Sequence, residues 1–171
     1  MKTRMSALLL TGIILASSAG TALAGVSPQP FRVNLARLDH VATAVSSAPD
    51  MIAAVLGVSP EPFCPVPDNV AAKEIGDLAK QMQRNEDKVM QVIETLDLTC
   101  DQLDMGAVVE RLGNIRTMSV GIIDMINERL GVEPVPFKVT NALDKLKRNS
   151  ESLVDTINIY LRSVGTPPID N

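Results

Sequence analysis

The 171-residue sequence has no tryptophan, one tyrosine, three phenylalanines, one histidine and two cysteines. So few aromatic rings leave no stacking platform of the kind on which single-stranded nucleic acids bind. The single histidine, His40, stands in no cluster of nitrogen, sulfur and carboxylate ligands, and the sequence has no Cys-x-x-Cys-His haem motif. We therefore predict no cofactor and no metal site, and we interpret His40 as a polar surface residue.

Sequence motifs of catalysis are missing as well. No serine stands in a Gly-x-Ser-x-Gly or Ser-x-x-Lys context, and no glycine-rich loop could cradle a phosphate. The Glu-x-x-His motif of di-iron bundles is absent. We expect that the protein is not an enzyme, and we assign no catalytic residue.

Residues 1–24 are typical of a secretory signal peptide. They combine a basic start, an apolar run over Ala7–Ala16 and a small-x-small cleavage site at Ala22-Leu23-Ala24. This run is shorter than the roughly 20 residues that span a bilayer, and no later run reaches that length. We predict a secreted or periplasmic protein with one mature domain, residues 25–171, and no membrane span after cleavage.

The charge balance narrows the class of partner. Two of the 16 basic residues and none of the 20 acidic ones lie in the signal peptide, so the mature chain carries 14 basic and 20 acidic residues, a net charge of −6. This acidic balance argues against nucleic acid and anionic lipid surfaces. Because 46% of the residues are hydrophobic and only 21% are charged, we predict a folded chain with an aliphatic core.

Apolar residues recur every three to four positions in four stretches, which predicts four amphipathic helices. We expect Asn34 to cap the first helix, Pro49 to kink or split it near Ser47, and Thr140 or Asn141 to cap the fourth. Gly76 is a possible break near the start of the second. The apolar stripes run over Leu35 to Leu56, Ile75 to Leu96, Val108 to Leu130 and Leu143 to Val164.

One short sequence motif, called the repeated phrase below, occurs twice, as residues 56–63 and as residues 130–137. Aligning Leu35–Phe63 with Val109–Phe137 gives twelve identities in 29 positions without a gap. The pattern predicts two copies of a helical hairpin with the order helix, Gly-Val-x-Pro-x-Pro-Phe, helix. We predict an all-α four-helix bundle made of two tandem, duplicated hairpins, about 32–98 and 103–164, docked with pseudo-two-fold symmetry.

The glycines and prolines of the repeated phrase are expected to end the helices. Gly57 and Gly131 are expected to stop helices, and the prolines after them prevent the helices from resuming. We expect the phenylalanines to plug the ends of the bundle. The alternative is that the phrase forms a contact surface for a partner. The residues of that possible contact surface are Val58, Phe63, Val132 and Phe137.

The two cysteines pose a geometric conflict. Export favours a disulfide between Cys64 and Cys100, but the second helix separates them, and a straight helix would hold their Cα atoms beyond the roughly 7 Å that a disulfide allows. The intrachain bond therefore requires a short or broken second helix, near Gly76 or around Gln83–Asp87. Otherwise the thiols stay separate and can cross-link chains, so that an oligomer is possible.

These observations favour a non-enzymatic, exported helical bundle with a protein-binding or structural role in the cell envelope or the extracellular space. The protein partner is unknown. The contact surface is expected at the phenylalanine-bearing end or in an apolar groove between the hairpins. The alternative is a carrier that holds a lipid or another apolar ligand between the two hairpins.

Overall fold

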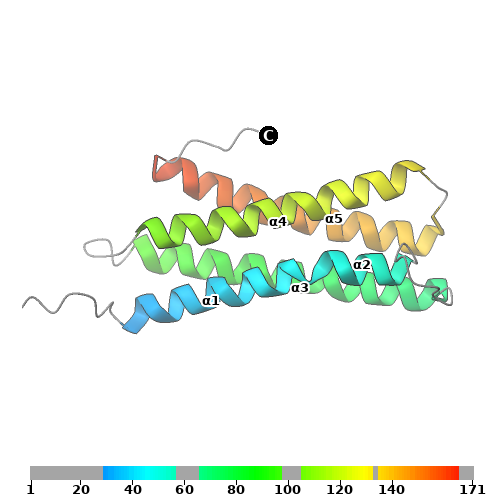
Figure 1. Ribbon diagram of the computed structural model, residues 1–171, viewed down its shortest axis with the longest axis horizontal. Coiled ribbons are helices and arrows are strands. Elements are labelled where there is room, and N and C mark those ends of the chain that lie inside the picture. The colour runs from blue at the N-terminus through cyan, green and yellow to red at the C-terminus, as the bar shows by residue number, and fades with distance from the viewer. Residues whose placement is uncertain (1–28, 57–65, 98–104, 133–134, 166–171) are drawn as a thin grey trace, which may run out of the picture.

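The computed structural model describes residues 29–56, 66–97, 105–132 and 135–165, in which the regular elements are all α-helices. Figure 1 shows α1 and α2 following one another as a single rod, so that four rods lie side by side. The predicted all-α four-helix bundle is confirmed. The helices are α1 (Gln29–Ser46), α2 (Ala48–Leu56), α3 (Asp68–Asp97), α4 (Met105–Val132) and α5 (Phe137–Ser163).

The break between α1 and α2 falls at Ser47, where the sequence predicted it. Pro49 has no backbone N–H, and its ring would clash with the carbonyl of Val45 in a continuous helix. In the first turn of α2 the same proline is tolerated, because no helical N–H is required there. Ala48 and Ile52 are buried like Val45, so the apolar stripe continues across the break.

Two predicted caps are wrong, because both helices begin earlier than expected. α1 already begins at Gln29, which places Asn34 inside the helix with 3% of its surface exposed. α5 begins at Phe137 behind Pro136, so Thr140 lies in the first turn and its hydroxyl donates to the carbonyl of Val135. Proline explains the early start of α5, since its fixed φ suits the helix entrance.

The glycines of the repeated phrase do not all stop helices. α4 continues through Gly131 and ends at Val132, so the predicted stop at Gly131 is wrong. Gly57 lies outside the described residues. Gly165 does end α5, with φ at 76°, a conformation that glycine adopts without a Cβ penalty. Gly76 does not interrupt α3, which is continuous over 30 residues.

The hairpins lie side by side rather than about a two-fold axis. The α1–α2 rod contacts α3 and α4, and α5 contacts the same two helices. Between their described residues, α3 does not contact α4, and α1 does not contact α5. Figure 1 shows α1 and α4 running in the same direction, with α3 and α5 both running the opposite way. One hairpin is therefore displaced sideways relative to the other, and the expected pseudo-two-fold symmetry is wrong.

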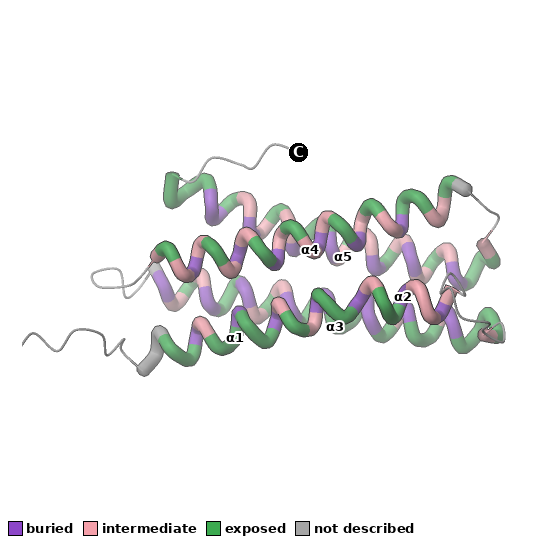
Figure 2. The backbone as a smooth tube through the Cα atoms, viewed as in Figure 1, coloured by how far each residue is buried: buried purple, intermediate pink, exposed green. Residues whose placement is uncertain are grey.

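The core lies along the axis of the bundle. Figure 2 shows buried residues recurring at short intervals along each rod. They belong to the stripes that the sequence predicted, and most of their side chains are fully inaccessible to solvent. Each rod contributes aliphatic residues to one continuous cluster, for example Leu38 and Ile52, Ile75 and Leu96, Leu112 and Ile126, and Leu143 and Ile157.

Candidate functional site

The predicted contact surface of four residues is only partly described. Val58 and Phe63 lie outside the described residues, and Val132 is the last residue of α4. Phe137 opens α5 and is 78% exposed, so the expectation that it plugs the bundle is wrong. The cause is helical geometry: Val139 carries the core stripe, and Phe137 is about 200° of helix rotation away from it. Phe137 therefore remains available for contact with a partner.

An apolar groove lies between α3 and α5, which belong to different hairpins. It has a volume of about 350 Å³. Met90 and Ile93 line it from α3, and Ile159 and Tyr160 line it from α5. Met90 is 43% exposed and Ile159 is 69% exposed, whereas Tyr160 is buried in the wall. Two large apolar side chains thus face solvent on either side of one groove.

Sequence reasoning missed Ile159 and Met90, although a signal was present. The stretch from Ile157 to Leu161 holds four apolar residues in five positions, more than one buried stripe requires. Ile157 and Leu161 are buried in the core, so the surplus residue, Ile159, faces outward.

Polar contacts join α3 and α5 beside this groove. The Asn149 Nδ2 donates to the carbonyl oxygen of Ala79 at 2.7 Å. Further along the helices, the hydroxyl groups of Ser152 and Thr156 donate to the Glu86 Oε1, at 2.6 and 3.3 Å. These contacts fix the relative position of the two hairpins along the bundle, and the apolar groove begins where they end.

Asn85 on α3 and Asn149 on α5 both lie toward the neighbouring helices. Asn85 is only 2% exposed, and Asn149 bonds across to α3. The apolar stripe passes on the same side as both asparagines, because Met82 and Val89 flank Asn85 at helical spacing and are buried too.

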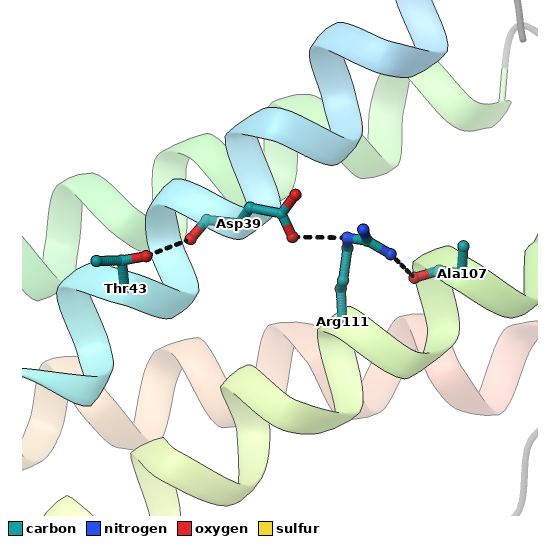
Figure 3. A network of polar contacts seen from close by, with 4 residues as sticks. All are labelled: Asp39, Thr43, Ala107 and Arg111. Atoms are coloured by element: carbon teal, nitrogen blue, oxygen red, sulfur yellow. Dashed lines mark hydrogen bonds and ion pairs between the residues drawn. The ribbon is translucent and has the colours of Figure 1, made fainter.

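α1 and α4 are joined by an ion pair. The Arg111 Nε donates to the Asp39 Oδ1 at 2.7 Å, and its Nη1 donates to the carbonyl of Ala107 at 3.2 Å. Figure 3 shows the guanidinium reaching from α4 toward the carboxylate on α1. The Asp39 side chain is 57% exposed, so the pair orients the hairpins more than it stabilises them.

The aligned threonines of the two hairpins make the same local bond. The Thr43 hydroxyl donates to the carbonyl of Asp39, and the Thr117 hydroxyl donates to the carbonyl of Gly113. Both lie beside a groove of about 460 Å³ between α1 and α4, whose lining is mainly small and polar. Threonine on an exposed helix face commonly bonds in this way, so the bonds themselves carry no chemistry.

The titratable groups of the described residues do not gather into a reactive centre. No three histidine, cysteine, aspartate or glutamate side chains in the described ranges lie close enough together to hold a metal ion. The pKa of Asp77 is lowered because Lys80 donates a hydrogen bond to it at 2.8 Å and adds a favourable charge. This pair lies on the surface, one helical turn apart. No described helix is long and apolar enough to cross a membrane.

Cys64 and Cys100 lie outside the described residues, so the structure tests neither the intrachain disulfide nor the alternative of separate thiols. The break in the second helix that the bond requires is not present, because α3 is continuous from Asp68 to Asp97. This stretch spans about 43 Å at 1.5 Å per residue. The four residues before it and the three after it can reach back by about 25 Å together, which leaves more than twice the span of a disulfide.

The comparisons with known proteins give no further assignment. Protein-family models, curated proteins and solved structures all gave no match to this chain.

Proposed function

We propose that this chain is a non-enzymatic, exported helical-bundle protein that binds another protein in the cell envelope or the extracellular space. The observation that carries the proposal is the apolar groove between α3 and α5, with Ile159 69% exposed at its edge. An amphipathic helix laid into a groove between two helices is a common mode of recognition. Covering Ile159 would contribute about 1–2 kcal/mol to such a complex.

The groove also suits a transient partner better than a permanent one. Its apolar side chains are few, and polar groups such as Glu94 and Thr156 line it as well. Interfaces that form and dissociate commonly have a small apolar centre within a polar rim. Phe137, at the opposite end of α5, offers a second exposed apolar residue for the same or another contact.

The alternative is a carrier of a lipid or another apolar ligand between the hairpins. It has less support, because the described core of the bundle consists largely of side chains with no solvent exposure, such as Leu112 and Ile115 on α4 and Leu146 on α5. Hydrogen bonds from Asn149 and Ser152 also join α5 to α3. A ligand would have to separate these contacts.

A photocrosslinking experiment tests the proposal. The mature chain carries benzoylphenylalanine at position 159 in one variant and at position 124 in a control, since Asp124 is exposed on α4 away from the groove. After incubation with envelope extract and culture medium of the host, we expect a discrete crosslinked protein from position 159 and not from position 124. The crosslink should be lost when Met90 is also replaced by glutamate.

Two outcomes would count against this function. Equal crosslinking from both positions, or none from position 159, removes the groove as a binding surface. Native mass spectrometry of the protein purified from its host addresses the alternative. A tightly held lipid that survives desalting would favour the carrier, whereas a ligand-free mass would count against it.

A further inference from the structure

A second groove lies on the other flank of the same turns of α3. It is formed between α1 and α3 and has a volume of about 510 Å³. The residues Met90 and Glu94 of α3 face the apolar groove, while Lys88 and Gln91, in the same two turns, face this one. A single partner lying along α3 would therefore cover both grooves. The lining of the second groove is Val33, Ala36, Arg37, His40, Lys88 and Gln91.

The charge of this groove is opposite to that of the whole chain. Arg37 and Lys88 are positively charged and none of the six lining side chains is acidic, in a chain whose net charge is −4 with histidine counted as neutral. Asp39, next to His40 in sequence, lies on the other side of α1 and bonds to Arg111. Arg37 and His40 are separated by one helical turn, as are Lys88 and Gln91 on the antiparallel α3, so four donors surround the groove.

The predicted repeat indicates what kind of group Arg37 and His40 bind. Arg37 and His40 align with Arg111 and Asn114 of the second hairpin. In that hairpin, Arg111 pairs with a carboxylate on the neighbouring helix α1, and Asn114 lines the groove between α4 and α1. Because the hairpins are displaced sideways, the equivalent surface of the first hairpin has no further hairpin beyond it. Arg37 thus occupies the position of an interhelical ion pair.

We propose that the groove between α1 and α3 receives carboxylates from an acidic amphipathic helix of a protein partner. This inference rests on the proposed function and names the chemistry of its partner: apolar residues for the groove at Ile159, and acidic residues one turn apart for the groove at Arg37. A second copy of this chain fits less well, because Gly113 stands in the second hairpin where Asp39 supplies the carboxylate in the first.

Fluorescence anisotropy with a synthetic helix tests the inference. The probe is a labelled peptide of about 14 residues, with leucines on one face and glutamates spaced i, i+4 beside them; a matched peptide has glutamine in place of glutamate. We expect the mature chain to bind the glutamate peptide saturably and about tenfold more tightly than the glutamine peptide. The double variant Arg37→Glu, Lys88→Glu should lose that preference.

The matched control is the double variant Lys145→Glu, Arg148→Glu, which replaces two exposed cations of α5 outside the groove. It changes the net charge by the same amount and should keep the tenfold preference. Circular dichroism confirms that both variants keep the helical content of the parent chain. No saturable binding of the glutamate peptide at about 1 mM, or equal loss in both double variants, overturns the inference.

Two further measurements test whether a second copy of the chain or a lipid, rather than a protein partner, occupies the groove between α1 and α3. Sedimentation that shows dimers sensitive to Arg37→Glu would assign the groove to a second copy and overturn the partner proposed here. Vesicles of phosphatidylglycerol that bind through Arg37 while the peptide does not would assign it to a lipid, with the same consequence. If the crosslink at position 159 persists while the peptide preference is absent, the proposed function stands and this inference falls.

Discussion

The hydrogen bond between Asn149 and the backbone of Ala79 offers a direct test of how the hairpins pack. It joins the two hairpins through a donor on α5 and a carbonyl on α3, at 2.7 Å. Replacing Asn149 by alanine removes the donor. The Ala79 carbonyl, in the middle of α3, still accepts its own helical bond, so no buried acceptor is orphaned. The loss is therefore the net value of one bond, about 1 kcal/mol.

Urea unfolding of the mature chain, followed by circular dichroism, measures this loss. We expect the free energy of unfolding of Asn149→Ala to fall by about 1 kcal/mol with an unchanged dependence on urea, and the Tm to fall by about 2–4 °C. The control is Arg148→Ala, because Arg148 is the exposed neighbour in the same helix. Its free energy should change by less than about 0.5 kcal/mol.

A second substitution at Asn149 gives a signature that depends on pH. Asn149→Asp places a carboxylate against the Ala79 carbonyl, and two acceptors repel unless the acid is protonated. The introduced carboxyl should therefore have a raised pKa in the folded state, so the variant is least destabilised at low pH and loses stability as the pH rises through that pKa. A pH-independent difference from Asn149→Ala, or an Asn149→Ala variant as stable as the parent, would refute this packing of α5 on α3.

Three other measurements address the core, a surface pair and the thiols. Leu146→Ala should lower the free energy of unfolding by about 2–5 kcal/mol, because Leu146 is fully buried; a smaller loss in urea unfolding would contradict the packed core. Lys80→Met should raise the pKa of Asp77 toward the ordinary value of an aspartate in an NMR titration; an unchanged pKa would exclude Lys80 as the cause of the lowering. Alkylation without reduction should modify both Cys64 and Cys100 in the folded monomer, or the thiols should link separate chains on a non-reducing gel. A monomer two hydrogen atoms lighter than the reduced chain would show that α3 opens.

The sequence contained enough information to predict the number of rods and their buried faces. Apolar residues at helical spacing became the core stripes, since each stripe has only one face to bury. The break at Ser47 was predictable because proline acts locally, through a missing donor and a steric clash. The disagreement at Asn34 arose because an asparagine before an apolar run favours a cap only when the helix begins there, and α1 begins at Gln29.

The arrangement of the rods was not predictable in the same way. A single apolar stripe shows that a helix is buried on one side, but it does not say which two neighbours flank it. That choice depends on contacts at the edges of the stripe, such as Asn149 with Ala79 and Arg111 with Asp39. These pairs are separated by 70 and 72 residues, and neither is marked by a local motif.

The groove between α3 and α5 lies at the edge of the buried apolar stripe rather than within it. Sequence reasoning therefore placed the candidate site elsewhere. The repeated phenylalanines predicted a contact surface at the end of the bundle, and Phe137 is exposed there. The α3–α5 groove instead depends on Ile159, whose neighbours Ile157 and Tyr160 both belong to the core. Ile159 and Met90 come together only because α3 and α5 pack side by side, and this packing places the two exposed side chains in the lining of one groove.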